Sequence, residues 1–206
     1  MKEKRTLSIA FIISILILIV IGIAMMFSVS FTSGLHEYKN YYYFIIRQLI
    51  WISAGGFCMI VASRINYKRY KKIRGVFFLG GLALLILVLI IGKEVNGAKR
   101  WLVMGPIVIQ PSEIAKITFI IYLSGALEYY KDKNYKSLEI LIAAVIPLFI
   151  FIVLIFMEKS FSSAVIIFVI GFSMIFVSKV KIEQLIIFFM SFVALGAFGI
   201  MQSDYR

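Results

Sequence analysis

Long apolar runs alternate along the chain with short polar segments that are rich in Lys, Arg, Tyr and turn-forming residues. A bilayer core about 30 Å thick is crossed by roughly 20 apolar residues in an α-helix. Seven runs approach that length, and they cover residues 7–28, 44–63, 76–92, 112–127, 138–157, 163–178 and 184–201. The pattern predicts an all-α polytopic membrane protein with seven transmembrane helices.

Composition supports the membrane class. Of the 206 residues, 62% are apolar and the mean hydropathy is +1.01, whereas soluble domains are about 45–50% apolar. This surplus excludes a water-soluble globular fold. The sequence has no long internal repeat, low-complexity tract or Gly/Ser linker, so residues 1–206 are predicted to form a single membrane domain.

The net charge of +12 comes from basic residues that lie between the apolar runs. This pattern is typical of topology signals and argues against nucleic-acid binding. The connection between the second and third runs has basic residues and no acid: Arg64, Lys68, Arg69, Lys71, Lys72 and Arg74. By the positive-inside rule this connection, the N-terminus, and residues 128–137 and 179–181 are predicted to be cytoplasmic. Residues 31–43, 93–111 and 202–206 then lie outside.

The outside segment 93–111 carries cations, an indole and two turn signals. Asn96-Gly97 and a later Gly-Pro pair are typical of tight turns, so the segment is predicted to fold back along the membrane surface. Trp101 is interpreted as an interfacial anchor or as a platform for a sugar or polyprenyl chain. Arg100 beside it suits phosphate recognition, because a guanidinium forks onto phosphate oxygens.

Polar residues also gather where the fourth run begins. Gln110 is followed by Pro111, which suits a first helical turn, and by Glu113, which complements the positive end of the helix dipole. Ser112, Glu113 and Lys116 are spaced to share one helix face just inside the bilayer. Ionisable groups at that depth are paired or functional. The Glu113–Lys116 pair is therefore interpreted either as a structural ion pair or as part of a catalytic site.

Two segments together resemble a known signature. Residues 96–101, Asn-Gly-Ala-Lys-Arg-Trp, and then Gln110–Lys116 resemble N-G-A-x-R-W…Q-P-[SA]-E-[FI]-x-K of the shape, elongation, division and sporulation family, the FtsW/RodA/SpoVE proteins. Residues 42–55 and the closing Tyr205-Arg206 resemble further family segments. Family members have about ten spans. The resemblance implies that this chain holds the N-terminal seven and stops at the start of a large external loop.

The resemblance implies a peptidoglycan glycosyltransferase of the bacterial cell membrane, which polymerises lipid II and works with a class B penicillin-binding transpeptidase. The reaction needs a general base for the acceptor hydroxyl and cations for the departing undecaprenyl pyrophosphate. By position, Trp101 matches the family's functional external Trp, and Arg100, Glu113 and Lys116 match its cavity-facing polar cluster. The family's aspartate lies in a T-D-F motif that these residues do not include. The chain is therefore expected to be inactive alone.

Two positions depart from the family pattern. The family's P-D-L-G-T segment aligns with residues 159–163, where Ser160 stands in place of the acid. Glu158 lies two positions earlier; compensation by it stays open, but it is not assigned the same role. A basic residue often found before the family's I-Q-P is here Val108, which removes one cation from the expected lipid path.

Redox and metal chemistry have little support in the sequence. The lone Cys58 excludes an internal disulfide and is interpreted as a packing residue in an apolar run. His36 stands alone in the loop expected over residues 31–43, and no His, Cys, Asp or Glu cluster has metal-ligand spacing. No metal site or cofactor is predicted, although a divalent cation that bridges the pyrophosphate stays open on chemical grounds.

Two other functions compete with the glycosyltransferase. A transporter that flips lipid-linked precursor would use the intramembrane Glu113 and Lys116, together with the glycine pairs at residues 55–56 and 80–81 as mobile points. A non-catalytic scaffold would recruit a transpeptidase through its helices. The sequence leaves open whether the protein serves division, elongation or sporulation.

Overall fold

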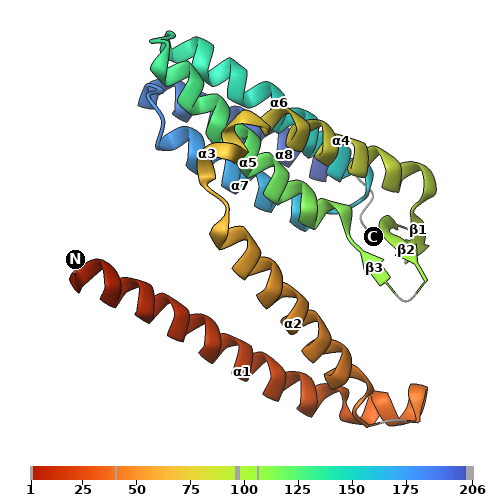
Figure 1. The fold of residues 1–206 in the computed structure, drawn as a ribbon. Coiled ribbons are helices and arrows are strands. Elements are labelled where there is room, and N and C mark those ends of the chain that lie inside the picture. Colours follow the sequence, from red (N-terminus) through yellow and green to blue (C-terminus); the bar gives the residue numbers. More distant parts are fainter. Residues whose placement is uncertain (1, 40, 96–97, 106, 203–206) are drawn as a thin grey trace. The chain divides into compact units, whose positions relative to one another are not determined.

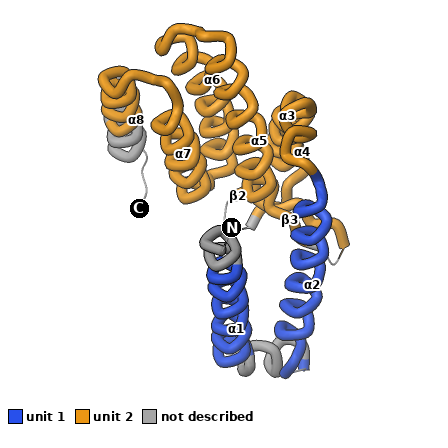
Figure 2. The backbone as a smooth tube through the Cα atoms, turned by 60° about the vertical axis from the view of Figure 1, so that its left-hand side comes forward, with its two compact units in different colours: residues 1–65 blue, residues 66–206 orange. Residues whose placement is uncertain are grey.

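The computed structural model describes residues 2–39, 41–95, 98–105 and 107–202. The chain divides into two compact units, Met1–Ile65 and Asn66–Arg206, coloured separately in Figure 2. Each unit is described by itself.

The first unit consists of α1 (Lys2–Tyr38) and α2 (Tyr43–Arg64), which contact each other (Figure 2). Both helices carry exposed apolar side chains, and α2 has no buried residue. Trp51 and Phe57 on α2 are examples of large side chains that are largely exposed. Such a surface is unfavourable in water and suits a hydrocarbon environment.

The helix α1 continues past the predicted end of the first apolar run. A connection was expected over residues 31–43, but α1 runs to Tyr38, so His36 lies in a helix and not in a loop. The sequence between residue 29 and residue 42 contains no proline that would break the helix. The helix ends before Lys39, whose φ of 52° lies in the left-handed region typical of helix C-termini.

The second unit combines six helices with a small sheet (Figure 1). Its helices are α3 (Tyr67–Lys72), α4 (Arg74–Ile91), α5 (Pro111–Asp132), α6 (Ser137–Met157), α7 (Phe161–Phe176) and α8 (Ile182–Gln202). The central helix is α5, which contacts α3, α4, α6 and α7. The short α3 was not predicted, because its six residues are polar and basic.

The core of this unit is built from apolar residues that recur every three or four positions. On α5, Ala115, Phe119 and Leu123 are fully buried at i, i+4 and i+8. On α6, Phe151 and Ile155 are also fully buried, and the rings of Phe119 and Phe151 lie 5.3 Å apart between centroids. One face of each helix therefore packs inward while the opposite face stays apolar and exposed.

A glycine sets how closely α4 approaches α5. A Cβ on the buried Gly81 would lie 2.3 Å from Thr118 Oγ1 and 3.1 Å from Cζ of Phe151. A Cβ on the neighbouring Gly80 would meet nothing within 4 Å. Gly81 thus serves close packing between helices, which is the commoner role of small residues in membrane helices.

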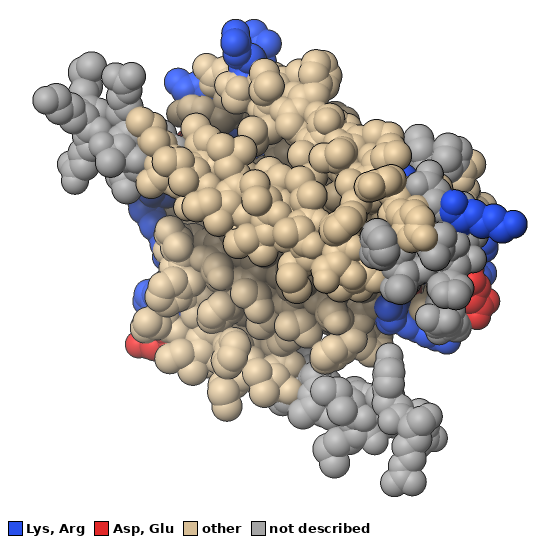
Figure 3. Space-filling view, turned by 90° about the horizontal axis from the view of Figure 1, so that it is seen from below, with Lys and Arg blue, Asp and Glu red and all other residues tan. Residues whose placement is uncertain are grey.

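A helix overlaps each of the seven predicted stretches, and four helices are long and apolar enough to cross a membrane. In the described residues these are Ile9–Ser30, Tyr43–Arg64, Arg74–Ile91 and Ser137–Met157, while Phe161–Phe176 and Ile182–Val193 are shorter apolar helices. The count of seven spans stays a prediction. Figure 3 shows a face on which uncharged residues dominate and Lys and Arg lie toward the margins.

Candidate substrate-binding site

The outside segment predicted from turn signals forms a three-stranded antiparallel sheet in the order β1-β2-β3. Its strands are β1 (Lys93–Val95), β2 (Ala98–Met104) and β3 (Ile107–Ile109). Asn96 and Gly97, between β1 and β2, lie outside the described residues, and Gly105, which follows β2, has a φ of 61° that suits glycine. The strands themselves were not predicted, although Asn-Gly between short apolar runs is a hairpin signal.

Strand β2 has buried and exposed side chains along its length. Ala98 and Leu102 are buried, and β2 contacts α4 and α5. Lys93 pairs with Trp101 and Glu94 with Lys99, so the register shifts and Arg100 is an extra residue of β2, where the alternation of side chains is interrupted. Trp101, which is half-buried, is paired across the sheet with Lys93.

Arg100 fastens the sheet to the turn between α6 and α7. Its Nε donates a hydrogen bond to the backbone carbonyl of Glu158 at 3.3 Å, and its Nη2 donates to the carbonyl of Lys159. A guanidinium has five N–H groups, so donors remain beyond these two contacts. The structure gives Arg100 a clamping role that the sequence did not indicate, because backbone carbonyls have no sequence signature.

Glu158 is a buried carboxyl in the same turn. Its side chain is 0% exposed, and neither carboxyl oxygen has a hydrogen-bond partner among the described residues. Burial raises the pKa of this carboxyl to about 7, against the opposing effect of the nearby Arg100 charge. Sequence reasoning left a role for Glu158 open. The available signal was an acid placed directly after the apolar α6.

The position where the family pattern has an acid holds a pair of hydroxyls. Ser160 Oγ donates to Ser163 Oγ at 2.9 Å, and both side chains are buried. Ser160 precedes α7 as its N-cap residue but makes no side-chain cap hydrogen bond. Val108, the other departure, lies exposed in β3.

The start of α5 carries the ion pair that the spacing suggested. Lys116 Nζ lies 2.7 Å from Glu113 Oε2, and the side chains of Lys116 and Glu113 are 14% and 56% exposed. Pro111 occupies the first turn, after Gln110 at the N-cap position. Ser112 is turned into the bundle, where its Oγ is buried and has no partner among the described residues. The Ser112 hydroxyl is therefore not hydrogen-bonded to either member of the ion pair.

The sheet, the start of α5 and the turn before α7 meet at one end of the second unit. The sheet leads directly into α5, β2 contacts α4 and α5, and Arg100 joins β2 to the turn before α7. The arrangement brings Arg100 and Glu158 together at one point, and Glu113 and Lys116 together at another. In the described part of the chain, no three His, Cys, Asp or Glu side chains group as metal ligands would.

The apolar helices, the central α5 and the polar end with its sheet define a multi-pass helical membrane protein. The chain belongs to the FtsW/RodA/SpoVE family of cell cycle proteins, whose family model matches residues 8–206. The match covers every residue assigned to the candidate site.

Two curated relatives are each named probable peptidoglycan glycosyltransferase FtsW. The protein from Coxiella burnetii is 34% identical over 188 residues, which are 88% of this chain and 50% of the relative. The protein from Pseudoalteromonas translucida is 31% identical over 192 residues, 93% of this chain and 48% of the relative. The chain thus spans about half the length of these relatives.

Solved structures share the fold. The crystal structure of the Thermus thermophilus rod shape determining protein RodA has a TM-score of 0.65 at 21% identity and covers 86% of this chain and 58% of that one. A chain from a study of polymerization and crosslinking by a peptidoglycan synthase complex has a TM-score of 0.67 at 21% identity, with 91% and 55% covered. The similarity supports the helical arrangement described above.

Proposed function

We propose that the protein takes part in polymerising lipid II into glycan strands, as a peptidoglycan glycosyltransferase of the bacterial cell membrane. Membership in the FtsW/RodA/SpoVE family supports this reaction class. The observation that carries the proposal is the Glu113–Lys116 pair at the start of α5, next to the sheet that presents Trp101. The N-terminus is proposed to be cytoplasmic, which places this site on the outer side, where lipid II would be polymerised.

The proposed chemistry divides between charge and stacking. Lys116 supplies a cation for the pyrophosphate that leaves the anomeric carbon, and Glu113 holds the ammonium in place. Trp101 offers an aromatic face to a sugar or to the polyprenyl chain. Gln110 flanks the same helix start as a further polar contact, and the remaining donors of Arg100 can reach an anion at the sheet edge.

The general base is proposed to come from outside these residues. The chain contains two aspartates, Asp132 and Asp204, and neither stands in a T-D-F motif. Asp132 ends α5 beside Lys71, far along the helix from Glu113. Catalysis is therefore proposed to require a T-D-F-bearing segment and a class B penicillin-binding transpeptidase as partner. A divalent cation on the pyrophosphate is compatible with this chemistry.

Substrate binding tests the site without requiring the base. The purified protein in detergent is titrated with fluorescent lipid II, and binding is compared for the wild type, Trp101→Ala and Lys116→Gln. Lys99→Gln is the matched control, since Lys99 is an exposed cation on the same strand as Trp101. We expect the two site variants to bind about tenfold more weakly, which is the effect of roughly 1.4 kcal/mol per lost contact. Equal binding by all four proteins would remove the site assignment.

A polymerisation assay tests the reaction itself. The protein is co-purified with a class B transpeptidase and the C-terminal half of the Coxiella burnetii relative, then supplied with lipid II. Glycan polymer that is lost in Glu113→Gln supports the proposal. Precursor movement into liposomes without polymer would favour the transporter, and transpeptidase binding without either activity would favour the scaffold.

A further inference from the structure

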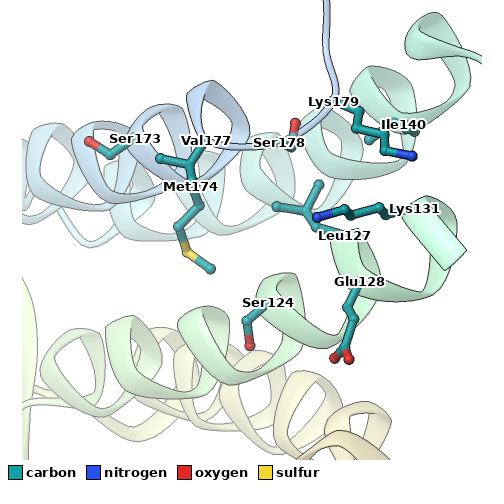
Figure 4. A pocket seen from close by; sticks show the side chains of 10 residues that line it. All are labelled: Ser124, Leu127, Glu128, Lys131, Ile140, Ser173, Met174, Val177, Ser178 and Lys179. Carbon is teal, nitrogen blue, oxygen red and sulfur yellow. The ribbon is translucent and has the colours of Figure 1, made fainter.

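A hollow lies at the end of α5 opposite the sheet. It has a volume of about 480 Å³ and opens between α5 and α7 (Figure 4). Its lining residues are Ser124, Leu127, Glu128, Lys131, Ile140, Ser173, Met174, Val177, Ser178 and Lys179. The volume is within the range of roughly 300–1,000 Å³ that is typical of small-molecule sites. None of these residues belongs to the candidate substrate-binding site.

The walls of the hollow are chemically apolar. Leu127, Ile140 and Met174 line it and belong to or pack against the hydrophobic core. The three serines of the lining use their hydroxyls locally. Ser173 Oγ donates to the carbonyl of Val169 at 2.7 Å, Ser124 Oγ to that of Ile121 at 3.1 Å, and Ser178 Oγ to that of Ile175 at 2.5 Å. Hydrocarbon is the occupant that fits such walls, because a polar ligand would lose its hydrogen bonds to water there.

One end of the hollow is positively charged. Lys131 and Lys179 are exposed and extend over the same end of it (Figure 4). The third ionic group, Glu128, points away from both lysines, and its carboxylate lies 3.0 Å from Lys71 Nζ. Among the described residues no carboxylate lies within ion-pair distance of Lys131 or Lys179. An apolar slot thus has two lysine side chains at one end.

We propose that this hollow binds an anionic phospholipid. One hydrocarbon chain lies along Leu127, Ile140 and Met174, and the headgroup phosphate lies between Lys131 and Lys179. Basic pockets between membrane helices at the cytoplasmic side are typical sites for anionic headgroups. A protein helix fits less well, because it would bury the two ammonium groups without a counter-charge. The site is separate from lipid II binding and does not rest on the proposed glycosyltransferase.

Retention of defined lipids tests this site. The protein in detergent is mixed with phosphatidylglycerol or phosphatidylcholine that have the same acyl chains, and bound lipid is counted by native mass spectrometry. We expect preference for phosphatidylglycerol. Lys131→Gln/Lys179→Gln should weaken its binding about 25-fold, since each cation near a headgroup contributes about fivefold. The matched control Lys68→Gln/Lys72→Gln removes the same charge from exposed positions on α3 and should bind like the wild type.

A variant that fills the hollow tests the apolar slot separately from the two lysine charges. Ser173→Phe fills the exposed wall of the hollow while leaving both lysines in place, and it should reduce phosphatidylglycerol retention. The proposal is overturned if the two lipids are retained equally, if both lysine double variants weaken binding alike, or if Ser173→Phe has no effect. It is also overturned if inorganic phosphate alone raises the unfolding temperature as much as phosphatidylglycerol does, since that would indicate a free-phosphate site.

Discussion

The guanidinium of Arg100 donates hydrogen bonds to the carbonyls of Glu158 and Lys159, so a strand and a helix turn that are far apart in sequence are joined by one side chain. The carboxyl of Glu158 lies buried at the same place without a hydrogen-bond partner among the described residues. The cation thus holds backbone dipoles in a region that also contains a buried acid. This contact ties the sheet to the bundle independently of the link from β3 into α5.

The clamp predicts that Arg100 is needed for stability. Arg100→Ala removes charged hydrogen bonds to two carbonyls, and we expect the free energy of unfolding to fall by about 2 kcal/mol. Arg100→Lys keeps the positive charge but lacks the planar guanidinium that reaches both carbonyls, so it should recover only part of the lost stability. Thermal unfolding in detergent measures both. Lys99→Ala, at an exposed position of the same strand, is the control and should unfold like the wild type.

Glu158 predicts a pH dependence of stability. Its pKa is raised from 4.5 to about 7, so the folded protein binds the proton more tightly than the unfolded chain does. The stabilisation by this proton is fully present below pH 4.5, is lost as the pH rises toward 7, and amounts to at most about 3 kcal/mol. Glu158→Gln stays neutral, so its unfolding temperature should vary less between pH 5 and pH 8 and should exceed the wild type's at pH 8. Parallel pH curves for the two proteins would contradict the assignment.

The sequence predicted the helices well because burial in lipid requires continuous apolar runs, and such runs are visible at residues 44–63 and 138–157. It missed features that depend on short segments or on distant partners. The helix α3 is too short and too basic to produce an apolar period. The extension of α1 to Tyr38 was not predicted, because the segment contains no helix-breaking proline that would mark where the helix ends.

In the candidate site, too, some contacts could be predicted from the sequence and others could not. The Glu113–Lys116 contact could be predicted because helical spacing fixes which side chains are neighbours. Ser112 differs from the ion pair in burial, because its side chain is fully buried whereas that of Glu113 is 56% exposed. The partners of Arg100 could not be predicted, because they are carbonyls supplied by the packing of α6 and α7 against the sheet.

Close packing between α4 and α5 predicts different outcomes for adjacent glycines. Gly81→Ala would place a Cβ 2.3 Å from Thr118 Oγ1, so we expect a loss of about 1–3 kcal/mol from overpacking. Gly80→Ala has open space and should be neutral or slightly stabilising, because alanine favours helix over glycine. Thr118→Ala combined with Gly81→Ala should recover part of the loss. Denaturant-free thermal unfolding distinguishes the four proteins, and equal effects at both glycines would contradict the packing role.

The Glu113–Lys116 pair allows its structural and functional roles to be separated. The pair is partly exposed and spans a single helical turn, so Glu113→Gln should cost only about 0.5 kcal/mol of stability. The swap Glu113→Lys/Lys116→Glu restores an ion pair but moves the cation toward the helix start and reverses the preferred dipole order. If Lys116 serves an anionic substrate, the swapped protein should unfold close to the wild type yet bind lipid II about tenfold more weakly. Unfolding temperature and lipid II titration, measured on the same preparations, give the two readouts. Full substrate binding by the swap would show that the pair only fastens α5, because the position of the charge would then have no effect on the ligand.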